Sequence, residues 1–291
     1  MKKIILWFLA FLITITAAIY QRKTGPTYPK RMDITLNNKI TELKLVRSLS
    51  LNAKPEVRLN ISDTSVKAKL FFKRYKTDEA FQSVVFVYRE SPVKSFIMNK
   101  IFKIYEDKGF FAVVPQQPPA GKIEYYFEIT DSQGSKTFLK ETPVIIRFKG
   151  DVPAFVLIPH ILLMFLAMLF STLAGLMSII KFPLYKKYAV WTLFLFIAGG
   201  FVLGPLVQYF AFGELWTGIP FGWDLTDNKT LIALIFWILA VAMNKNKERP
   251  LYTALAAIVL LLVFSIPHSL FGSELHYSTG HIPSGIILNF F

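Results

Sequence analysis

The chain has 291 residues, of which 53% are hydrophobic, and it carries a formal net charge of +14. Its mean hydropathy of +0.44 is too high for an ordinary soluble domain, whereas its 18% of charged residues is too many for a membrane bundle throughout. The sequence has no cysteine, which excludes a disulfide framework, a thiolate metal site, a c-type haem attachment and a lipoprotein anchor.

An apolar segment with a positively charged start opens the chain. Lys2 and Lys3 precede an uncharged run at residues 4–20, which is about long enough to span a membrane. Two interpretations are open: residues 1–20 form a retained N-terminal transmembrane helix or signal anchor, or they form a signal peptide that is removed. Both interpretations send the chain out of the cytoplasm, through a basic linker at residues 21–31 that contains glycine and proline.

A β domain is predicted at residues 32–150. Short strand signals bounded by turn residues recur there, and residues 57–61 and 66–70 alternate apolar with polar side chains as half-buried strands do. The strand candidates are residues 32–36, 40–46, 57–61, 66–75, 81–88, 96–105, 110–114, 123–130, 136–140 and 144–148. These candidates, with no amphipathic helix among them, predict a β-sandwich.

The clearest supersecondary signal in this domain is a hairpin at residues 121–138. A tyrosine-rich strand leads into an Asp-x-x-Gly turn, in which Gly134 can take a positive φ, and a second strand follows. With its Pro-Pro-Ala-Gly start at residues 118–121, this hairpin resembles the last hairpin of fibronectin-III and immunoglobulin-like modules. The resemblance implies an interaction fold and names no particular partner.

The sequence becomes nearly uncharged after Val152. Four apolar spans are predicted, at about residues 153–180, 188–212, 227–244 and 250–267. The second span contains Gly204-Pro205, which predicts a kink. The tail at residues 268–291 is too short and too interrupted by glycine and proline to cross again. The expected fold is therefore an N-terminal helix, an extracytoplasmic immunoglobulin/fibronectin-III-like β-sandwich and a C-terminal four-helix transmembrane bundle at residues 152–267.

Basic residues predict the orientation of these spans. Lys2, Lys3 and the clusters at residues 181–187 and 245–249 all fall on one side if the spans alternate. The positive-inside rule makes that side the cytoplasm. We therefore expect an integral protein of the cytoplasmic membrane of a bacterium, with its N-terminus inside and with the β domain and the C-terminal tail outside.

The polar, aromatic loop at residues 213–230 separates the second and third spans of the bundle. It is predicted to be a structured cap on the outer membrane face, with its tryptophans in the interfacial aromatic belt. Either Thr226 or Asp227 is expected to cap the following helix. Asp224 lies further out, so it remains a candidate ligand or proton acceptor.

All four histidines of the chain map to the outer membrane face. His160 and His268 each follow an Ile-Pro pair near the outer end of a span, and His276 and His281 lie in the tail. With Asp224 they form a candidate ligand set for zinc, copper or non-haem iron, and two histidines at matching depth can ligate a haem. We expect His160 and His268 to lie close together. The alternative is that these histidines only hydrogen-bond to lipid headgroups or loop carbonyls.

Two functions remain open at this point. The first is a non-enzymatic envelope protein without a cofactor, whose β domain binds or positions another envelope protein above the bundle. The alternative is a redox or metal- or haem-dependent membrane protein with a His/Asp site at the extracytoplasmic face. No charged residue interrupts the centre of a span, which disfavours a transporter. The lysines of the β domain are scattered without an aromatic stacking face, so the lipid bilayer is an expected partner and nucleic acid is not.

Overall fold

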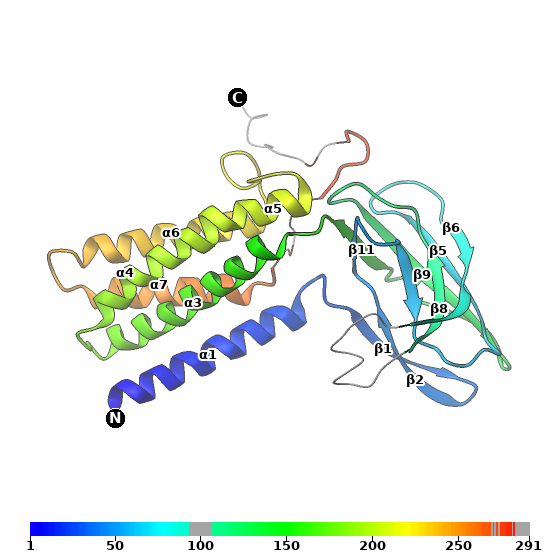
Figure 1. Cartoon of the computed structure of the whole chain (residues 1–291), viewed down its shortest axis with the longest axis horizontal. Helices are drawn as coiled ribbons and strands as arrows, with labels where there is room; N and C mark the ends of the chain where they lie inside the picture. The colour runs from blue at the N-terminus through cyan, green and yellow to red at the C-terminus, as the bar shows by residue number, and fades with distance from the viewer. Residues whose placement is uncertain (93–105, 269, 271, 273, 281, 283–291) are drawn as a thin grey trace. The chain divides into compact units, whose positions relative to one another are not determined.

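The computed structural model of the chain is a mixed α+β structure (Figure 1). It describes all residues except 93–105, 269, 271, 273, 281 and 283–291. Contacts divide the chain into two compact units, which we call the helical unit (Met1–Pro26 and Gly150–His276) and the β unit (Thr27–Lys149 and Tyr277–Thr279). The chain therefore leaves the β unit after residue 149 and returns to it at residue 277.

Strands in the described part of the β unit form three sheets. The strands are β1 (Lys30–Leu36), β2 (Lys39–Leu45), β3 (Ser48–Ser50), β4 (Glu56–Leu59), β5 (Lys67–Arg74), β6 (Gln82–Val85), β7 (Val87–Pro92), β8 (Glu106–Val113), β9 (Lys122–Asp131), β10 (Gly134–Phe138) and β11 (Val144–Lys149). The largest sheet has the order β3-β11-β9-β5-β6, with β10 paired to β9, and the smaller sheets are β1-β2 and β4-β8-β7.

Most strands follow the sequence prediction, and the differences have local causes. The hairpin at residues 121–138 is confirmed, because β9 and β10 pair antiparallel and Gly134 takes a φ of +121°. The predicted strand 81–88 is interrupted at Phe86, which is buried and donates its amide to the Ala68 carbonyl at 2.9 Å. At this point the chain passes from the largest sheet to β4-β8-β7. The predicted strand 96–105 lies outside the described residues.

Alternating burial along the strands builds the core of the β unit. Leu70 of β5, Tyr125 and Phe127 of β9 and Phe148 of β11 are fully buried in one apolar cluster. The Tyr125 hydroxyl donates to the Val46 carbonyl at 3.1 Å, so this buried phenol keeps a hydrogen-bond partner. Burial raises the pKa of Tyr125, because the charged form would lose its hydration.

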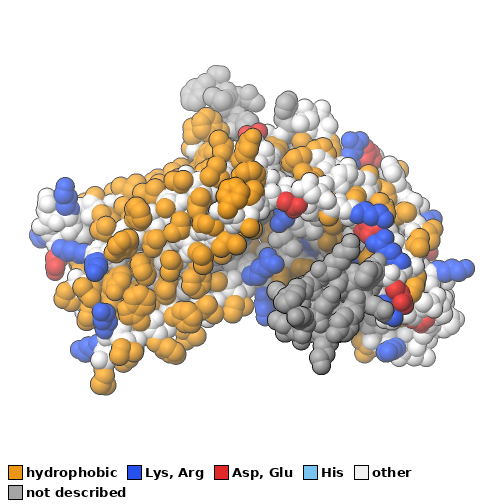
Figure 2. Space-filling view, in the orientation of Figure 1, with side chains coloured by type: hydrophobic (Ala, Val, Ile, Leu, Met, Phe, Trp, Pro, Cys, Tyr) orange, Lys and Arg blue, Asp and Glu red, His pale blue; other side chains and the backbone are white. Residues whose placement is uncertain are grey.

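Four helical stretches of the described chain are long and apolar enough to cross a membrane, and they fit a membrane protein. They are α1 (Lys2–Thr24), α3 (Ala154–Ile179), the stretch Tyr185–Phe212 and α6 (Leu225–Met243). The third stretch is composed of α4 (Tyr185–Phe196), the π-helical segment η1 (Ile197–Leu203) and α5 (Gly204–Phe212). A shorter apolar helix, α7 (Pro250–Ser265), has 16 residues. Hydrophobic side chains cover the visible face of the helical unit, and Lys and Arg gather at the end where α1 begins (Figure 2).

Close packing joins the helices of this unit. Trp7 of α1 lies edge-on to Phe170 and Tyr188, with ring centroids 5.9 and 5.7 Å apart. Beside these rings, α1 and α3 share a buried cluster that contains Leu6, Ala10, Leu169, Leu173 and Met177. Helix α3 also approaches α7 closely, because a Cβ on Gly175 would lie 2.5 Å from the Ala257 Cβ. Helix α1 is therefore part of the core of the helical unit.

Candidate functional site

The loop at residues 213–224, which joins α5 to α6, is the most distinctive part of the helical unit. Gly213 ends α5 with a φ of +87°, a conformation that glycine adopts without strain. The next helix is capped by Asp224, whose Oδ1 accepts a hydrogen bond from the Thr226 amide at 2.7 Å. This corrects the prediction that Thr226 or Asp227 is the cap. Those residues already lie in the first turn, and the Thr226 amide is itself the donor that has to be capped.

Because Asp224 caps α6, the Asp227 side chain is available to form hydrogen bonds with the loop. Its Oδ2 accepts hydrogen bonds from the Thr217 amide at 2.7 Å and from the Thr217 hydroxyl at 3.2 Å. Gln208 of α5 donates to the same hydroxyl at 2.7 Å, so one chain of hydrogen bonds joins α5, the loop and α6. Asn228 adds a further bond, because its Oδ1 accepts from the Ile219 amide at 2.7 Å. Two consecutive residues of α6 therefore fix the backbone of the loop.

Lys229, the next residue, connects α6 to the end of α7. Its side chain is buried, and its Nζ donates to the Ile266 carbonyl at 2.8 Å and approaches the Pro267 carbonyl at 3.5 Å. The carbonyls at the end of a helix have no partner in the next turn, so an ammonium group can satisfy them. Lys229 therefore acts as a side-chain cap for α7.

His160 of α3 contacts the π-helical segment η1. The Gly204 amide donates to the Gly199 carbonyl, five residues earlier in the chain, and His160 Nδ1 lies 3.0 Å from the same carbonyl oxygen. The sequence predicts a kink at Gly204-Pro205, and the structure has a π-helical segment that ends where α5 begins. The acceptor is a carbonyl of a helical segment and not of a loop, and a hydrogen bond from Nδ1 to it leaves Nε2 as the nitrogen for any ligand.

The remaining candidate ligands are distributed along the end of the chain and the loop. His268 and His276 are exposed, whereas His281 lies outside the described residues. One oxygen of Asp224 is engaged in capping α6. Among the residues that the structure describes, no group of three or more His, Asp or Glu side chains is arranged to hold a metal ion. Shared ligation of a metal or haem by His160 and His268 stays a prediction.

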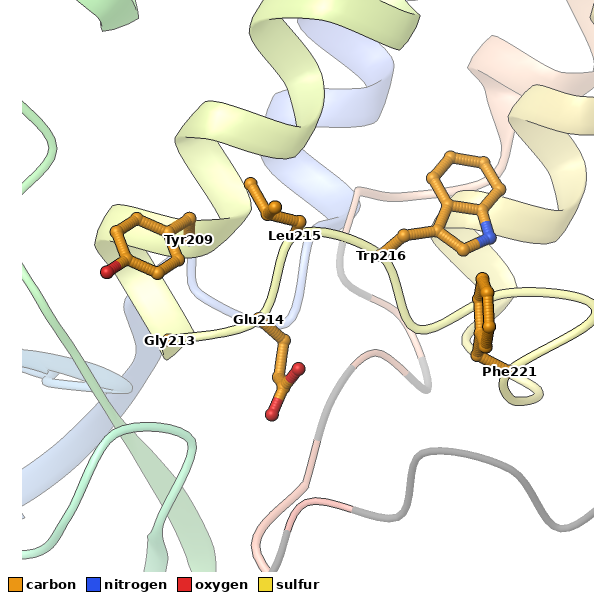
Figure 3. A pocket seen from close by; sticks show the side chains of 6 residues that line it. All are labelled: Tyr209, Gly213, Glu214, Leu215, Trp216 and Phe221. Atoms are coloured by element: carbon orange, nitrogen blue, oxygen red, sulfur yellow. The ribbon is translucent and has the colours of Figure 1, made fainter.

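A shallow hollow of about 420 Å³ lies where the loop leaves α5. Its lining consists of Tyr209, Gly213, Glu214, Leu215, Trp216 and Phe221. Tyr209 lies on one side of Glu214, and the rings of Trp216 and Phe221 lie on the other (Figure 3). Two contacts hold the Trp216 ring: its Nε1 donates to the Ile219 carbonyl at 3.1 Å, and its centroid lies 5.6 Å from that of Phe201. The hollow combines one carboxylate with three aromatic rings on a backbone that is held in place.

A second hollow, of about 380 Å³, lies on the β unit and has a polar lining that includes Lys73, Arg74 and Glu79. Arg74 forms an ion pair with Glu79, and hydrogen bonds from this guanidinium hold the pKa of the Glu79 carboxyl below its ordinary value. The Arg74 guanidinium also lies over the ring of Tyr277, 5.1 Å from its centroid.

Comparisons with protein families, curated proteins and solved structures found no match to this chain.

Proposed function

We propose that this protein is a non-enzymatic membrane protein of the bacterial cell envelope, which holds its β unit at the extracytoplasmic face of the cytoplasmic membrane and binds another envelope protein there. In this proposal the β unit is an immunoglobulin/fibronectin-III-like sandwich, a class supported by the β9–β10 hairpin and by the alternating burial of its strands. The N-terminus is cytoplasmic, because the basic clusters of the helical unit lie on that side.

The return of the chain to the β unit at Tyr277 carries this proposal. The Tyr277 hydroxyl accepts a hydrogen bond from the Lys122 amide at 2.9 Å. It lies 2.7 Å from the Lys122 carbonyl and 3.0 Å from Gln117 Oε1, either of which can accept its proton. Residues 149 and 277 thus belong to one unit, although all the helices from α3 to α7 lie between them in sequence. This supports an even number of membrane crossings between them, with α7 as the last.

The packing of α1 supports a retained first helix. A removed signal peptide would take Leu6, Ala10 and Trp7 with it and would uncover Leu173 and Met177, which are fully buried beneath them. Retention gives the β unit a membrane anchor at its N-terminal end as well as after residue 149. An interaction domain held in this way is restricted in orientation, which lowers the entropy cost of binding a partner in the same membrane.

The outer face of the largest sheet has the properties of a partner-binding surface. Phe71 of β5, which is half-buried, stacks on the buried Tyr126 of β9 with centroids 4.7 Å apart, and Phe81, which is 36% exposed, lies edge-on to Tyr126 at 4.9 Å. The Nζ atoms of Lys69 and Lys73 lie 5.3 and 5.2 Å from the Phe71 and Phe81 centroids. The prediction that the lysines lack an aromatic face is therefore wrong, because strand pairing brings these residues together. Aromatic groups with a cationic rim favour a protein partner with an apolar, acidic-rimmed surface.

Site-specific photocrosslinking in intact membranes tests this function. A photoreactive residue replaces Val85, which is 63% exposed on the adjacent edge strand β6, and the matched control replaces Ile40, which is 73% exposed on the β1-β2 sheet. We expect a discrete heavier product from position 85 only, and a weaker one when Lys69→Glu reverses the charge of the face. Equal products from both positions, no product, or a product with twice the mass of the chain would contradict binding of a different envelope protein through this face.

A further inference from the structure

The hollow beside Glu214 has the chemistry of a cation-binding site. Glu214 is half-buried, and no hydrogen bond or ion pair joins it to the residues that the structure describes. The aromatic rings of Tyr209, Trp216 and Phe221 line the hollow together with Gly213 and Leu215. Aromatic faces attract cations through their quadrupole, and a carboxylate adds a full negative charge, so the two together favour an ammonium group over an anion. A single carboxylate with aromatic neighbours is a poor ligand set for a metal ion, which prefers several oxygen or nitrogen donors.

The position of the hollow in the chain indicates the source of such an ammonium group. Tyr209 belongs to the last turns of the apolar stretch Tyr185–Phe212, so the hollow begins where a membrane-spanning stretch ends. Its rim continues into an apolar surface, because Leu215 and Phe221 are each more than half exposed. Exposed aromatic and apolar side chains at the end of a span lie at the level of the lipid headgroups.

We propose that this hollow binds the ammonium headgroup of a zwitterionic phospholipid, with Glu214 as the counterion and with Trp216 and Phe221 as the aromatic wall. The hydrogen bonds from the loop to Asp227 and Asn228 keep the backbone of the wall in one conformation, so little ordering is needed when the headgroup enters. The acyl chains of the lipid lie along the exposed apolar side chains of α5. The site is independent of the partner-binding face on the β unit.

Native mass spectrometry of the full chain, released from detergent with equal amounts of phosphatidylethanolamine and phosphatidylglycerol, tests this assignment. We expect the wild-type protein to retain phosphatidylethanolamine preferentially. In Glu214→Gln the ratio of retained phosphatidylethanolamine to retained phosphatidylglycerol should fall roughly tenfold. Glu248→Gln, which removes the same charge from the turn between α6 and α7, is the matched control and should keep the preference. Phe221→Ala should reduce the preference for phosphatidylethanolamine, because it removes one ring of the aromatic wall. The variant should still fold, because Phe221 is exposed.

Two further measurements separate the alternatives. Phosphatidylcholine should also be retained, because a quaternary ammonium group interacts well with aromatic faces. Soluble phosphoethanolamine should bind far more weakly than the lipid, because it lacks acyl chains. Equal retention of phosphatidylglycerol, or a Glu214→Gln variant that behaves as the wild type, would overturn the assignment. Tight binding of soluble phosphoethanolamine would show that the hollow serves a soluble amine and would also overturn it.

Discussion

The two ends of α6 hold their neighbours in different ways. At its start, four side chains form the hydrogen bonds: Asp224 caps the helix, Asp227 and Asn228 fix the loop, and Lys229 caps α7. At its end, a single buried side chain, Asn244, closes the turn to α7. Its Oδ1 accepts from the Tyr185 hydroxyl and the Arg249 amide, each at 2.8 Å, and its Nδ2 donates to the Ala240 and Arg249 carbonyls at 2.8 and 3.0 Å.

This difference follows from the lengths of the two connections. The turn after Asn244 is short, so one amide group reaches both of its sides. The loop at residues 213–224 is longer, so one side chain cannot reach all of it. Its Thr217 and Ile219 amides donate to two different side chains, those of Asp227 and Asn228. Stability is therefore concentrated in one residue at one end of α6 and distributed over several at the other. Single substitutions should have unequal effects at the two ends.

Asn244→Ala should have the largest effect, because it removes the five side-chain hydrogen bonds of a buried turn, including one from Nδ2 to the Thr253 hydroxyl at 3.3 Å. We expect the free energy of unfolding of the helical unit to fall by about 2–4 kcal/mol, measured by thermal or denaturant unfolding in detergent. Lys245→Ala, at the exposed neighbouring position, is the control and should stay within about 0.5 kcal/mol of the wild type. Equal stabilities of the two variants would show that Asn244 does not carry the turn.

Asp227→Ala should have a smaller and more local effect. It removes the acceptor of the Thr217 amide and hydroxyl, with an expected cost of about 1–3 kcal/mol. Asn228 and Lys229 remain, so α6 should stay in place while the loop loosens. Limited proteolysis should then cut residues 213–224 faster without faster cutting at residues 244–249. Asp224→Asn should leave the cleavage pattern unchanged, because asparagine caps a helix about as well as aspartate.

Lys229→Met should change stability by less than about 1 kcal/mol, although Lys229 is buried. The substitution removes a hydrogen bond to the Ile266 carbonyl, but it also removes the cost of burying a charge, and methionine fills most of the space. Lys229→Ala should cost more, because it adds a cavity. A loss for Lys229→Met as large as that for Asp227→Ala would show that the ammonium cap is strongly stabilising.

The smallest expected effect is a pH-dependent loss of local stability at the tip of the β1–β2 hairpin in the β unit. There Asn37 forms hydrogen bonds to other segments of the chain, as Asn244 does in the helical unit. Its amide donates to Asp131 Oδ2 at 3.2 Å, and its Nδ2 donates to Asp63 Oδ2 at 2.7 Å. The Asn37 amide, and then that of Gln133, hold the pKa of Asp131 below its ordinary value. The stabilisation is therefore complete above the unfolded pKa of about 4 and is lost as pH falls through the folded pKa.

Hydrogen exchange measured at neutral pH and at a series of pH values stepping downward from the unfolded pKa of about 4 tests this pH dependence. Amides at the tip of the β1–β2 hairpin should lose protection at the lower pH values, after correction for the intrinsic exchange rates. Amides of β9 beside Tyr125 should keep their protection, because their partners are backbone carbonyls of β5 and β11. Uniform loss of protection in both places would indicate global unfolding and would contradict a local role of Asp131.

Features set by local periodicity could be predicted from the sequence. The predicted span at residues 153–180 coincides closely with α3, and the predicted hairpin at residues 121–138 contains β9 and β10. Apolar length and alternation carry this information within short windows. Strand β3 was not predicted, because its three residues, which pair in parallel with β11, are too few to show an alternating pattern.

Features that depend on residues far apart in the chain could not be predicted in this way. The stacking of Phe71 on Tyr126 requires the register of β5 on β9. The role of Lys229 requires the position of the Ile266 carbonyl, although a lysine just inside an apolar span already indicates that an acceptor is needed. The cap at Asp224 was missed because Asp224, Thr226 and Asp227 all favour helix starts, and only backbone geometry distinguishes them.

The bond from Lys229 to the end of α7 has a consequence for biosynthesis. Helix α6 is synthesised before α7, so Lys229 is made before the carbonyls at residues 266 and 267 that accept its hydrogen bonds. A lysine in an apolar helix disfavours insertion of that helix alone. Under the proposed membrane topology, release of α6 into the lipid is therefore most favourable when α7 accompanies it, and we expect the two helices to enter the membrane as a hairpin.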